Sequence, residues 1–143
     1  MPTILIVDAD DAFRKFLHTI FDQSGGFHSC VEAGNGAAAI AKTKHLLLNL
    51  AVLDFSLPDM NGLQSARELK AIAPEMAIFM LAVGNELDIE QEALSCGVTA
   101  VFSKLDDLTT LVANARAVCE FHDVAGKDAS KQRLRRKKCT HHL

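Results

Sequence analysis

The stretch LAVLDFSLPDMNG, residues 50–62, joins a continuous apolar run to a polar turn. We expect a strand over residues 50–55, because the apolar run at residues 50–53 is typical of a strand that is buried on both faces of a parallel sheet. Pro58 and Gly62 are residue types that fix a turn, and helical spacing follows over residues 61–72. The stretch therefore predicts a strand–turn–helix unit with Asp54 near the carboxyl end of its strand.

The same unit repeats on both sides of this stretch. Apolar runs predict further strands at residues 4–7, 27–33, 77–82 and 98–102. Amphipathic spacing predicts further helices at residues 13–21, 37–46, 86–96 and 106–121. Asn35 is expected to cap the second helix. Five strand–helix pairs in strict alternation predict an α/β fold in which helices cover both faces of a parallel sheet.

Charge divides the chain into an acidic body and a basic end. Residues 1–125 contain 8 Lys and Arg against 17 Asp and Glu, whereas residues 126–143 contain 7 against 1. We interpret residues 1–125 as one domain and residues 126–143 as a linker or flexible end, with contact to nucleic acid or an acidic partner as the alternative. No helix-turn-helix fits in the basic end, so nucleic acid is not expected to bind through this domain. Cys139 with His141 and His142 has only a faint resemblance to a metal-binding pair.

Nothing in the sequence points to a membrane or to secretion. No stretch approaches the roughly 20 apolar residues of a membrane span, and the apolar run at residues 3–7 is too short for a secretory signal. No Cys-x-x-Cys pair is formed by the cysteines, which are Cys30, Cys96, Cys119 and Cys139. We therefore expect a cytoplasmic protein with reduced thiols.

Three side chains with useful chemistry follow separate predicted strands. Asp8 comes directly after the first strand, Asp54 lies near the end of the third, and Lys104 follows the fifth. Because the carboxyl ends of parallel strands share one edge of the sheet, we expect these side chains to converge there. Clustered carboxylates attract a hard cation such as Mg²⁺, a carboxylate can be a nucleophile toward phosphorus, and a lysine can neutralise a phosphate.

The order and spacing of these residues resemble the receiver domains of two-component response regulators. The most specific part is Asp54 with the sequence LPDMNG at residues 57–62, supported by Arg14 six residues after Asp8 and by the lysine that follows the fifth strand. The resemblance covers residues 3–121. It implies a flavodoxin-like (βα)5 three-layer sandwich with strand order 2-1-3-4-5.

The resemblance also implies a role for each site residue. Asp54 would accept a phosphoryl group from a histidine kinase or a phosphotransfer protein, and Lys104 would contact the phosphoryl oxygens. Mg²⁺ would be held by Asp8, Asp54 and the Ser56 backbone carbonyl, with Asp10 as a further candidate ligand. The resemblance implies a signalling module of this kind rather than an enzyme.

Four positions depart from the pattern of the family. Ala9 stands where the family has an acidic metal ligand, and Ala82 stands where it has a Thr or Ser hydroxyl that bonds the phosphoryl group. Val101 replaces the aromatic residue that rotates in the switch, although Phe102 is its neighbour. Leu105 replaces a proline that follows a cis bond, so we expect a trans bond there. The sequence therefore predicts impaired metal binding and a blunted readout.

Two other functions stay open at this point. The first is a receiver fold that binds a partner without phosphorylation, through the face formed by the fourth helix, the fifth strand and the fifth helix. Homodimerisation through that face is a related possibility, and the acids of the fourth helix, at positions 86, 88, 90 and 92, favour a basic partner. The second is a haloacid dehalogenase-type hydrolase, because Asp8-Ala9-Asp10 after a strand is similar to the Asp-x-Asp signature of that superfamily.

Overall fold

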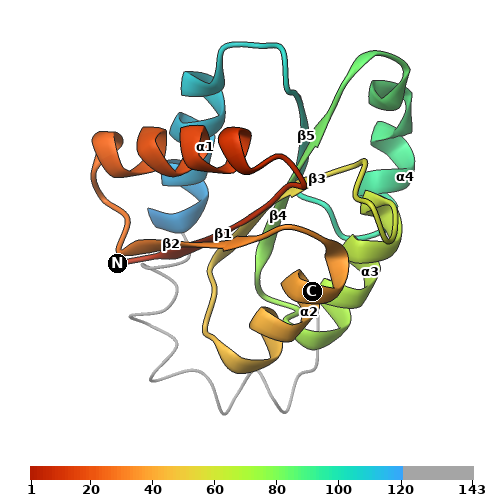
Figure 1. Ribbon diagram of the computed structural model, residues 1–143, viewed down its shortest axis with the longest axis horizontal. Coiled ribbons are helices and arrows are strands. Elements are labelled where there is room, and N and C mark those ends of the chain that lie inside the picture. The colour runs from red at the N-terminus through yellow and green to blue at the C-terminus, as the bar shows by residue number, and fades with distance from the viewer. Residues whose placement is uncertain (121–143) are drawn as a thin grey trace.

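The computed structural model describes residues 1–120, so the proposed boundary near residue 125 and the basic end lie outside the described residues. Strands and helices alternate as predicted (Figure 1). The strands are β1 (Thr3–Val7), β2 (Ser29–Ala33), β3 (Leu50–Asp54), β4 (Ala77–Ala82) and β5 (Ala100–Ser103). The helices are α1 (Asp11–Ser24), α2 (Gly36–His45), α3 (Gly62–Ile72), the 3₁₀ helix η1 (Gly84–Ile89), α4 (Glu90–Ser95) and a last helix described over residues 108–120.

All five strands are parallel and lie in the order β2-β1-β3-β4-β5, which confirms the predicted topology. Figure 1 shows α1 and the last helix on one face of the sheet, and α2, α3 and α4 on the other. Leu17 and Phe21 of α1 pack with Phe79 in one core layer, whereas Leu69 of α3 packs with Ile78 in the other. The sheet is therefore the middle of three layers.

Burial follows position in the sheet. Every residue of β3 and β4 is buried, because helices cover both faces of these central strands. The edge strands β2 and β5 are mostly half-buried. No helix within residues 1–120 is long and apolar enough to cross a bilayer.

Side chains just outside the helices fix where the helices begin. Asn35 Oδ1 accepts a hydrogen bond from the Ala38 N–H (2.7 Å), which confirms the predicted cap of α2. Asn61 caps α3 in the same way, since its Oδ1 accepts from the Gln64 N–H (2.9 Å). These caps satisfy donors that have no partner inside the helix.

The prediction of one continuous helix over residues 86–96 is wrong. The structure forms the 3₁₀ helix η1 first and a short α4 after it. The acids at positions 86, 88, 90 and 92 supply like-charge pairs four residues apart, which destabilise a regular α-helix. Gly84 also enters the segment with a left-handed φ of 53°. Local sequence and charge therefore shorten the helix.

Several other boundaries differ by one or two residues. The second strand begins at Ser29 rather than residue 27, and the fifth covers Ala100–Ser103 rather than residues 98–102. The last helix begins at residue 108 rather than 106, because Asp107 Oδ1 accepts a hydrogen bond from the Thr109 N–H (3.0 Å) and acts as its cap. No cis peptide bond occurs in the part of the chain that the structure describes, in agreement with the trans bond expected before Leu105.

Candidate functional site

The backbone ladder of the sheet brings the predicted site residues to one edge. The Asp8 N–H extends the pairing of β1 with β2 by donating to Ala33 O (3.1 Å). Asp54 ends β3, and the Lys104 N–H donates to Ala82 O (3.0 Å) at the end of β4. All three residues therefore stand at the carboxyl ends of parallel strands, where ligands bind in open α/β sheets.

Lys104 joins the two carboxylates. Its Nζ donates to Asp8 Oδ2 at 2.7 Å and lies 3.5 Å from Asp54 Oδ2. Asp8 and Asp54 are buried, with 2% and 5% of their surface exposed, and Lys104 Nζ lies 4.5 Å from the centre of the Phe13 ring. The predicted convergence is thus what the structure shows for these three side chains: one ammonium group between two buried carboxylates.

The charges in this cluster do not balance. Burial, and then the neighbouring Asp8 carboxylate, raise the pKa of Asp54 from 3.8 to about 6. Burial lowers the pKa of Lys104, but its contacts with Asp8 and Asp54 outweigh this effect and raise it above its ordinary value. Two carboxylates that share one ammonium group form a site that favours a further cation.

Ser56 lies in the loop after β3 and links Asp54 to a residue far along the chain. The Ser56 N–H donates to Asp54 Oδ1 (3.3 Å), and the Ser56 hydroxyl donates to Glu86 Oε2. The other oxygen of Glu86 accepts from the Val83 N–H (3.0 Å). Glu86 therefore ties η1 to the loop beside Asp54, whereas the sequence placed it on an acidic helix face; no local signal indicated this contact.

The side chain of Asp10 is engaged by helix α1. Its Oδ1 accepts from the N–H groups of Ala12 (3.0 Å) and Phe13 (3.3 Å), while its own N–H donates to Asp8 Oδ1 (2.8 Å). Ala9 next to it has no side-chain donor or acceptor. A metal contact by Asp10 would compete with the helix cap, so Asp8 and Asp54 are the better-placed carboxylate ligands.

The positions that depart from the family pattern lie around the same edge. Ala82 is fully buried at the end of β4, and its methyl group cannot donate a hydrogen bond. Val101 packs toward the layer of α3, whereas Phe102 packs on the opposite face, with its ring 5.0 Å from that of Phe79. Phe102 therefore cannot take the place of the missing aromatic residue. Leu105 is 83% exposed.

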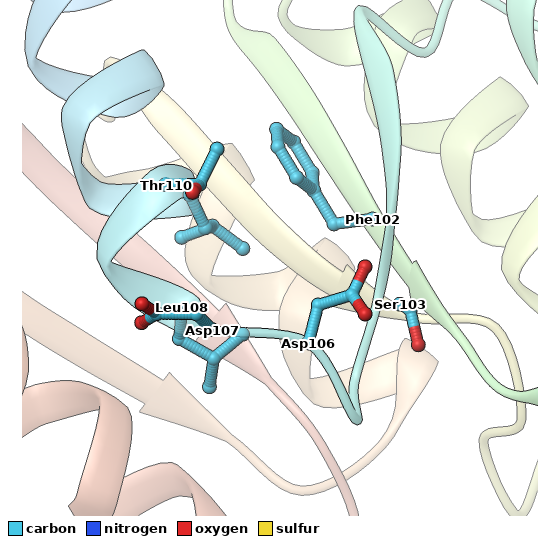
Figure 2. Close-up of a pocket in the computed structure, with 7 residues that line it drawn as sticks. Phe102, Ser103, Asp106, Asp107, Leu108 and Thr110 are labelled. Atoms are coloured by element: carbon cyan, nitrogen blue, oxygen red, sulfur yellow. The ribbon is translucent and has the colours of Figure 1, made fainter.

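A separate cavity of about 270 Å³ lies between the end of β5 and the start of the last helix (Figure 2). It is lined by Phe102, Ser103, Asp106, Asp107, Leu108, Thr110 and Leu111. None of the residues of the carboxylate cluster lines it. The cluster therefore sits at the sheet edge rather than in this cavity.

Asp59 has a structural role that the sequence did not reveal. Its two carboxylate oxygens accept from the N–H groups of Gly36 (2.8 Å) and Ala37 (2.9 Å) at the start of α2. These two hydrogen bonds hold the pKa of Asp59 below its usual range. Asp59 thus anchors the turn after β3 to the neighbouring helix.

The strand order defines a flavodoxin-like α/β protein, and its carboxyl edge gathers two carboxylates and one ammonium group. The chain belongs to the response regulator receiver domain family, which it matches over residues 4–116. It is 32% identical over 94 residues to the chemotaxis protein CheY of Bacillus subtilis, an alignment that covers 66% of this chain and 78% of that protein.

Two further similarities bear on fold and on length. The receiver domain protein of Methanospirillum hungatei matches with a TM-score of 0.78 and 25% identity, over 86% of this chain and 98% of that one. A protein-glutamate methylesterase/protein-glutamine glutaminase of Paramagnetospirillum magneticum is 32% identical over 86% of this chain but only 33% of its own length. The chain spans about half or less of the longer curated relatives that it matches.

Proposed function

We propose that this chain is a phosphoacceptor of two-component signalling that takes a phosphoryl group onto Asp54. The observation that carries the proposal is the buried Asp54 carboxylate at the end of β3, beside Asp8 and 3.5 Å from Lys104 Nζ. The proposed donor is a histidine kinase or a phosphotransfer protein. The pKa of about 6 leaves Asp54 mainly ionised at neutral pH, which is the form that can act as a nucleophile.

The residues at the sheet edge fit a Mg²⁺ ion. Asp8 and Asp54 supply two hard carboxylate groups, and the proposed third ligand is the Ser56 backbone carbonyl. Mg²⁺ in proteins is often bound by one or two carboxylates and keeps several waters, so Ala9 weakens the site without removing it. When bound, the ion supplies positive charge that allows an anionic phosphoryl group to approach the carboxylates.

The chain's own residues carry the rest of the transfer. An oxygen of Asp54 forms the new O–P bond while the P–N bond of the donor imidazole breaks, and the donor nitrogen keeps that electron pair. Lys104 stabilises the charge on the phosphoryl oxygens. Because Ala82 offers no hydroxyl to the product, the rearrangement that follows phosphorylation is expected to be smaller than in a receiver with Thr or Ser there.

The test is to incubate the full chain with a small phosphodonor and Mg²⁺ and to measure its intact mass. The expected result is a phosphoryl-sized gain that disappears without Mg²⁺ and in Asp54→Asn, and that persists in Asp59→Asn. Asp59 is a good control because its carboxylate lies in the same loop but bonds to α2. No gain in a folded native chain, while a known receiver is labelled alongside it, would refute the proposal.

One observation favours a second candidate function, binding to a partner without phosphorylation. Leu87 in η1, Leu94 in α4 and Leu105 after β5 are 37%, 48% and 83% exposed, on the segments predicted to form the interaction face. The proposed partner is a basic protein or a second copy of the chain. Binding that is equal for the native chain and Asp54→Asn, and that is lost in Leu105→Asp, would favour this function. The hydrolase alternative gains no support, since β4 ends in Ala82 without a carboxylate.

A further inference from the structure

A second group of metal-ligating side chains lies between α1 and β2. The ligand atoms of His18, Asp22 and Cys30 all lie within 4.8 Å of one another. Cys30 pairs with Ile4 of β1, toward the amino end of the strands, whereas Asp8 lies beyond the carboxyl end of β1. The group is therefore distinct from the proposed phosphorylation site.

Secondary structure accounts for the convergence. His18 and Asp22 are four residues apart in α1, so they lie on the same face of that helix. Cys30 and Glu32 are two residues apart in β2, so they lie on the same face of the sheet. Cys30 packs against the core layer that contains α1, which brings the helix pair and the strand pair together.

Glu32 fixes the orientation of the imidazole. Its Oε1 accepts from Arg14 Nε (3.1 Å), and its Oε2 lies 2.9 Å from His18 Nδ1. The ion pair with Arg14 makes Glu32 a carboxylate, which can accept hydrogen bonds but cannot donate them. Nδ1 of His18 therefore carries a hydrogen, and in the neutral ring the lone pair is on Nε2.

The lone pair on Nε2 faces another acceptor. His18 Nε2 lies 3.5 Å from Asp22 Oδ2, and two acceptors at that distance need a proton or a cation between them. A carboxylate that bonds one ring nitrogen while the other nitrogen binds metal is the usual support of a histidine ligand. Glu32 and His18 have this arrangement, and Asp22 and Cys30 offer the other two metal-ligating atoms.

We propose that His18, Asp22 and Cys30 bind one Zn²⁺ ion, with a water as the fourth ligand and Glu32 as the positioning residue of His18. Nitrogen, sulfur and carboxylate donors in one set suit zinc and not Mg²⁺. Zinc–ligand bonds of about 2.0–2.3 Å place tetrahedral ligand atoms roughly 3.5 Å apart. The ligand atoms of His18, Asp22 and Cys30 lie within 4.8 Å of one another, so they must approach by about 1 Å when zinc binds. Asp22 is exposed and can make that movement.

Zinc would also change the protonation of Cys30. A thiol coordinates zinc as the thiolate, so zinc binding at Cys30 would release the thiol proton.

The experiment is a titration of the full chain with Co²⁺, which reports thiolate coordination as a near-ultraviolet charge-transfer band, followed by displacement with Zn²⁺. The chain titrated carries Cys139→Ser, His141→Ala and His142→Ala, because these residues offer ligands of the same kind. We expect one equivalent to bind with the band. Cys30→Ser removes the band, His18→Gln weakens binding at least tenfold, and Glu32→Gln weakens it about 10- to 100-fold.

Two controls separate this site from other cysteines and from the phosphorylation site. Cys96→Ser changes another half-buried cysteine and should leave the charge-transfer band unchanged, and so should Asp54→Asn, because a carboxylate gives no thiolate band. The proposal would be overturned if the folded chain that carries the three substitutions at residues 139, 141 and 142 showed no charge-transfer band. A band that survives Cys30→Ser, or one that is lost in Asp54→Asn, would also overturn it.

Discussion

Asp54 is held where its charge is unfavourable. Its carboxylate is buried next to Asp8, and the contact with Lys104 offsets only part of the cost. A group in this position lowers the stability of the protein whenever it is ionised. Under the proposed function, the same position would place the Asp54 oxygens beside the ammonium group of Lys104, which would stabilise an incoming phosphoryl group.

The first prediction concerns Asp54 and pH. The pKa of Asp54 is about 6 in the folded chain against an ordinary value of 3.8, so the unfolded chain loses this proton first as the pH rises from 4 to 6. Its contribution to stability therefore falls across that range and stays low above it. We expect Asp54→Asn to raise the free energy of unfolding by about 1–2 kcal/mol at pH 7.5, and by much less at pH 4.

Urea denaturation at several pH values measures this effect, with Asp59→Asn as the matched control. The pKa of Asp59 is lowered, so its contribution is present at neutral pH and is lost as the pH falls. Asp59→Asn should therefore decrease stability at pH 7.5, the opposite sign from Asp54→Asn. A decrease for both variants would contradict the stated role of Asp54.

The second prediction concerns the residue next to Asp8. Ala9 is exposed and precedes Asp10, whose carboxylate is engaged by α1. Ala9→Asp adds a third carboxylate near the proposed Mg²⁺ ligands and should tighten Mg²⁺ binding by about tenfold, or ~1.4 kcal/mol. Thermal unfolding over a Mg²⁺ series measures the affinity. Ala12→Asp adds the same charge at an exposed position of α1 and should have little effect on Mg²⁺ affinity. An equal gain in affinity in Ala12→Asp would show that added negative charge attracts Mg²⁺ without providing a specific ligand.

Turns and short helices hold the loops on both sides of Asp54 in place. The turn after β3 is held by the Gly62 N–H, which donates to Phe55 O (2.7 Å), and by the contact of Asp59 with α2. On the other side, Glu86 connects η1 to Ser56. The two loops around Asp54 are therefore fixed by different helices.

The third prediction tests the turn after β3. A Cβ on Gly62 would lie 2.8 Å from Phe55 Cα and 3.2 Å from Asp54 O, both of which are backbone atoms. Gly62→Ala should therefore destabilise the chain by about 1–3 kcal/mol and slow the labelling of Asp54. Denaturation and the phosphodonor assay measure the two effects. Gly34→Ala is the control, because a Cβ there would lie 3.5 Å from its nearest atom, and it should change neither stability nor labelling. If Gly62→Ala also changes neither, the turn adapts to the added methyl group.

The three layers share the central strands, so we expect them to unfold together. Adjacent residues of β4 serve both layers: Ile78 packs with α3 and Phe79 packs with α1. A substitution that leaves a cavity in either core layer should therefore lower the stability of the whole domain.

The fourth prediction is that Ile78→Ala and Phe79→Ala destabilise the domain by about 2–5 and 3–5 kcal/mol, each with one cooperative transition. Circular dichroism and hydrogen exchange should give the same midpoint for helices on both faces. Leu47→Ala is the control, because Leu47 is 96% exposed and its loss should change stability by less than about 0.5 kcal/mol. Separate transitions for the two layers would contradict this expectation.

The sequence by itself determined the parts that depend on local order. Apolar runs identified the buried strands, and polar residues such as Asn35 identified helix starts, because periodicity and caps involve residues that are close along the chain. The rule that parallel strands end at one edge was enough to bring Asp8, Asp54 and Lys104 together.

Only the tertiary structure decided the interactions that depend on burial and on distant partners. Lys104 pairs with Asp8 across 96 positions, and the pKa of Asp54 follows from that packing. The contact of Glu86 with Ser56 and the approach of Cys30 to α1 have no local signature. Electrostatic energies depend on solvent exposure and separation in space, and neither quantity is encoded in the spacing of residues along a chain.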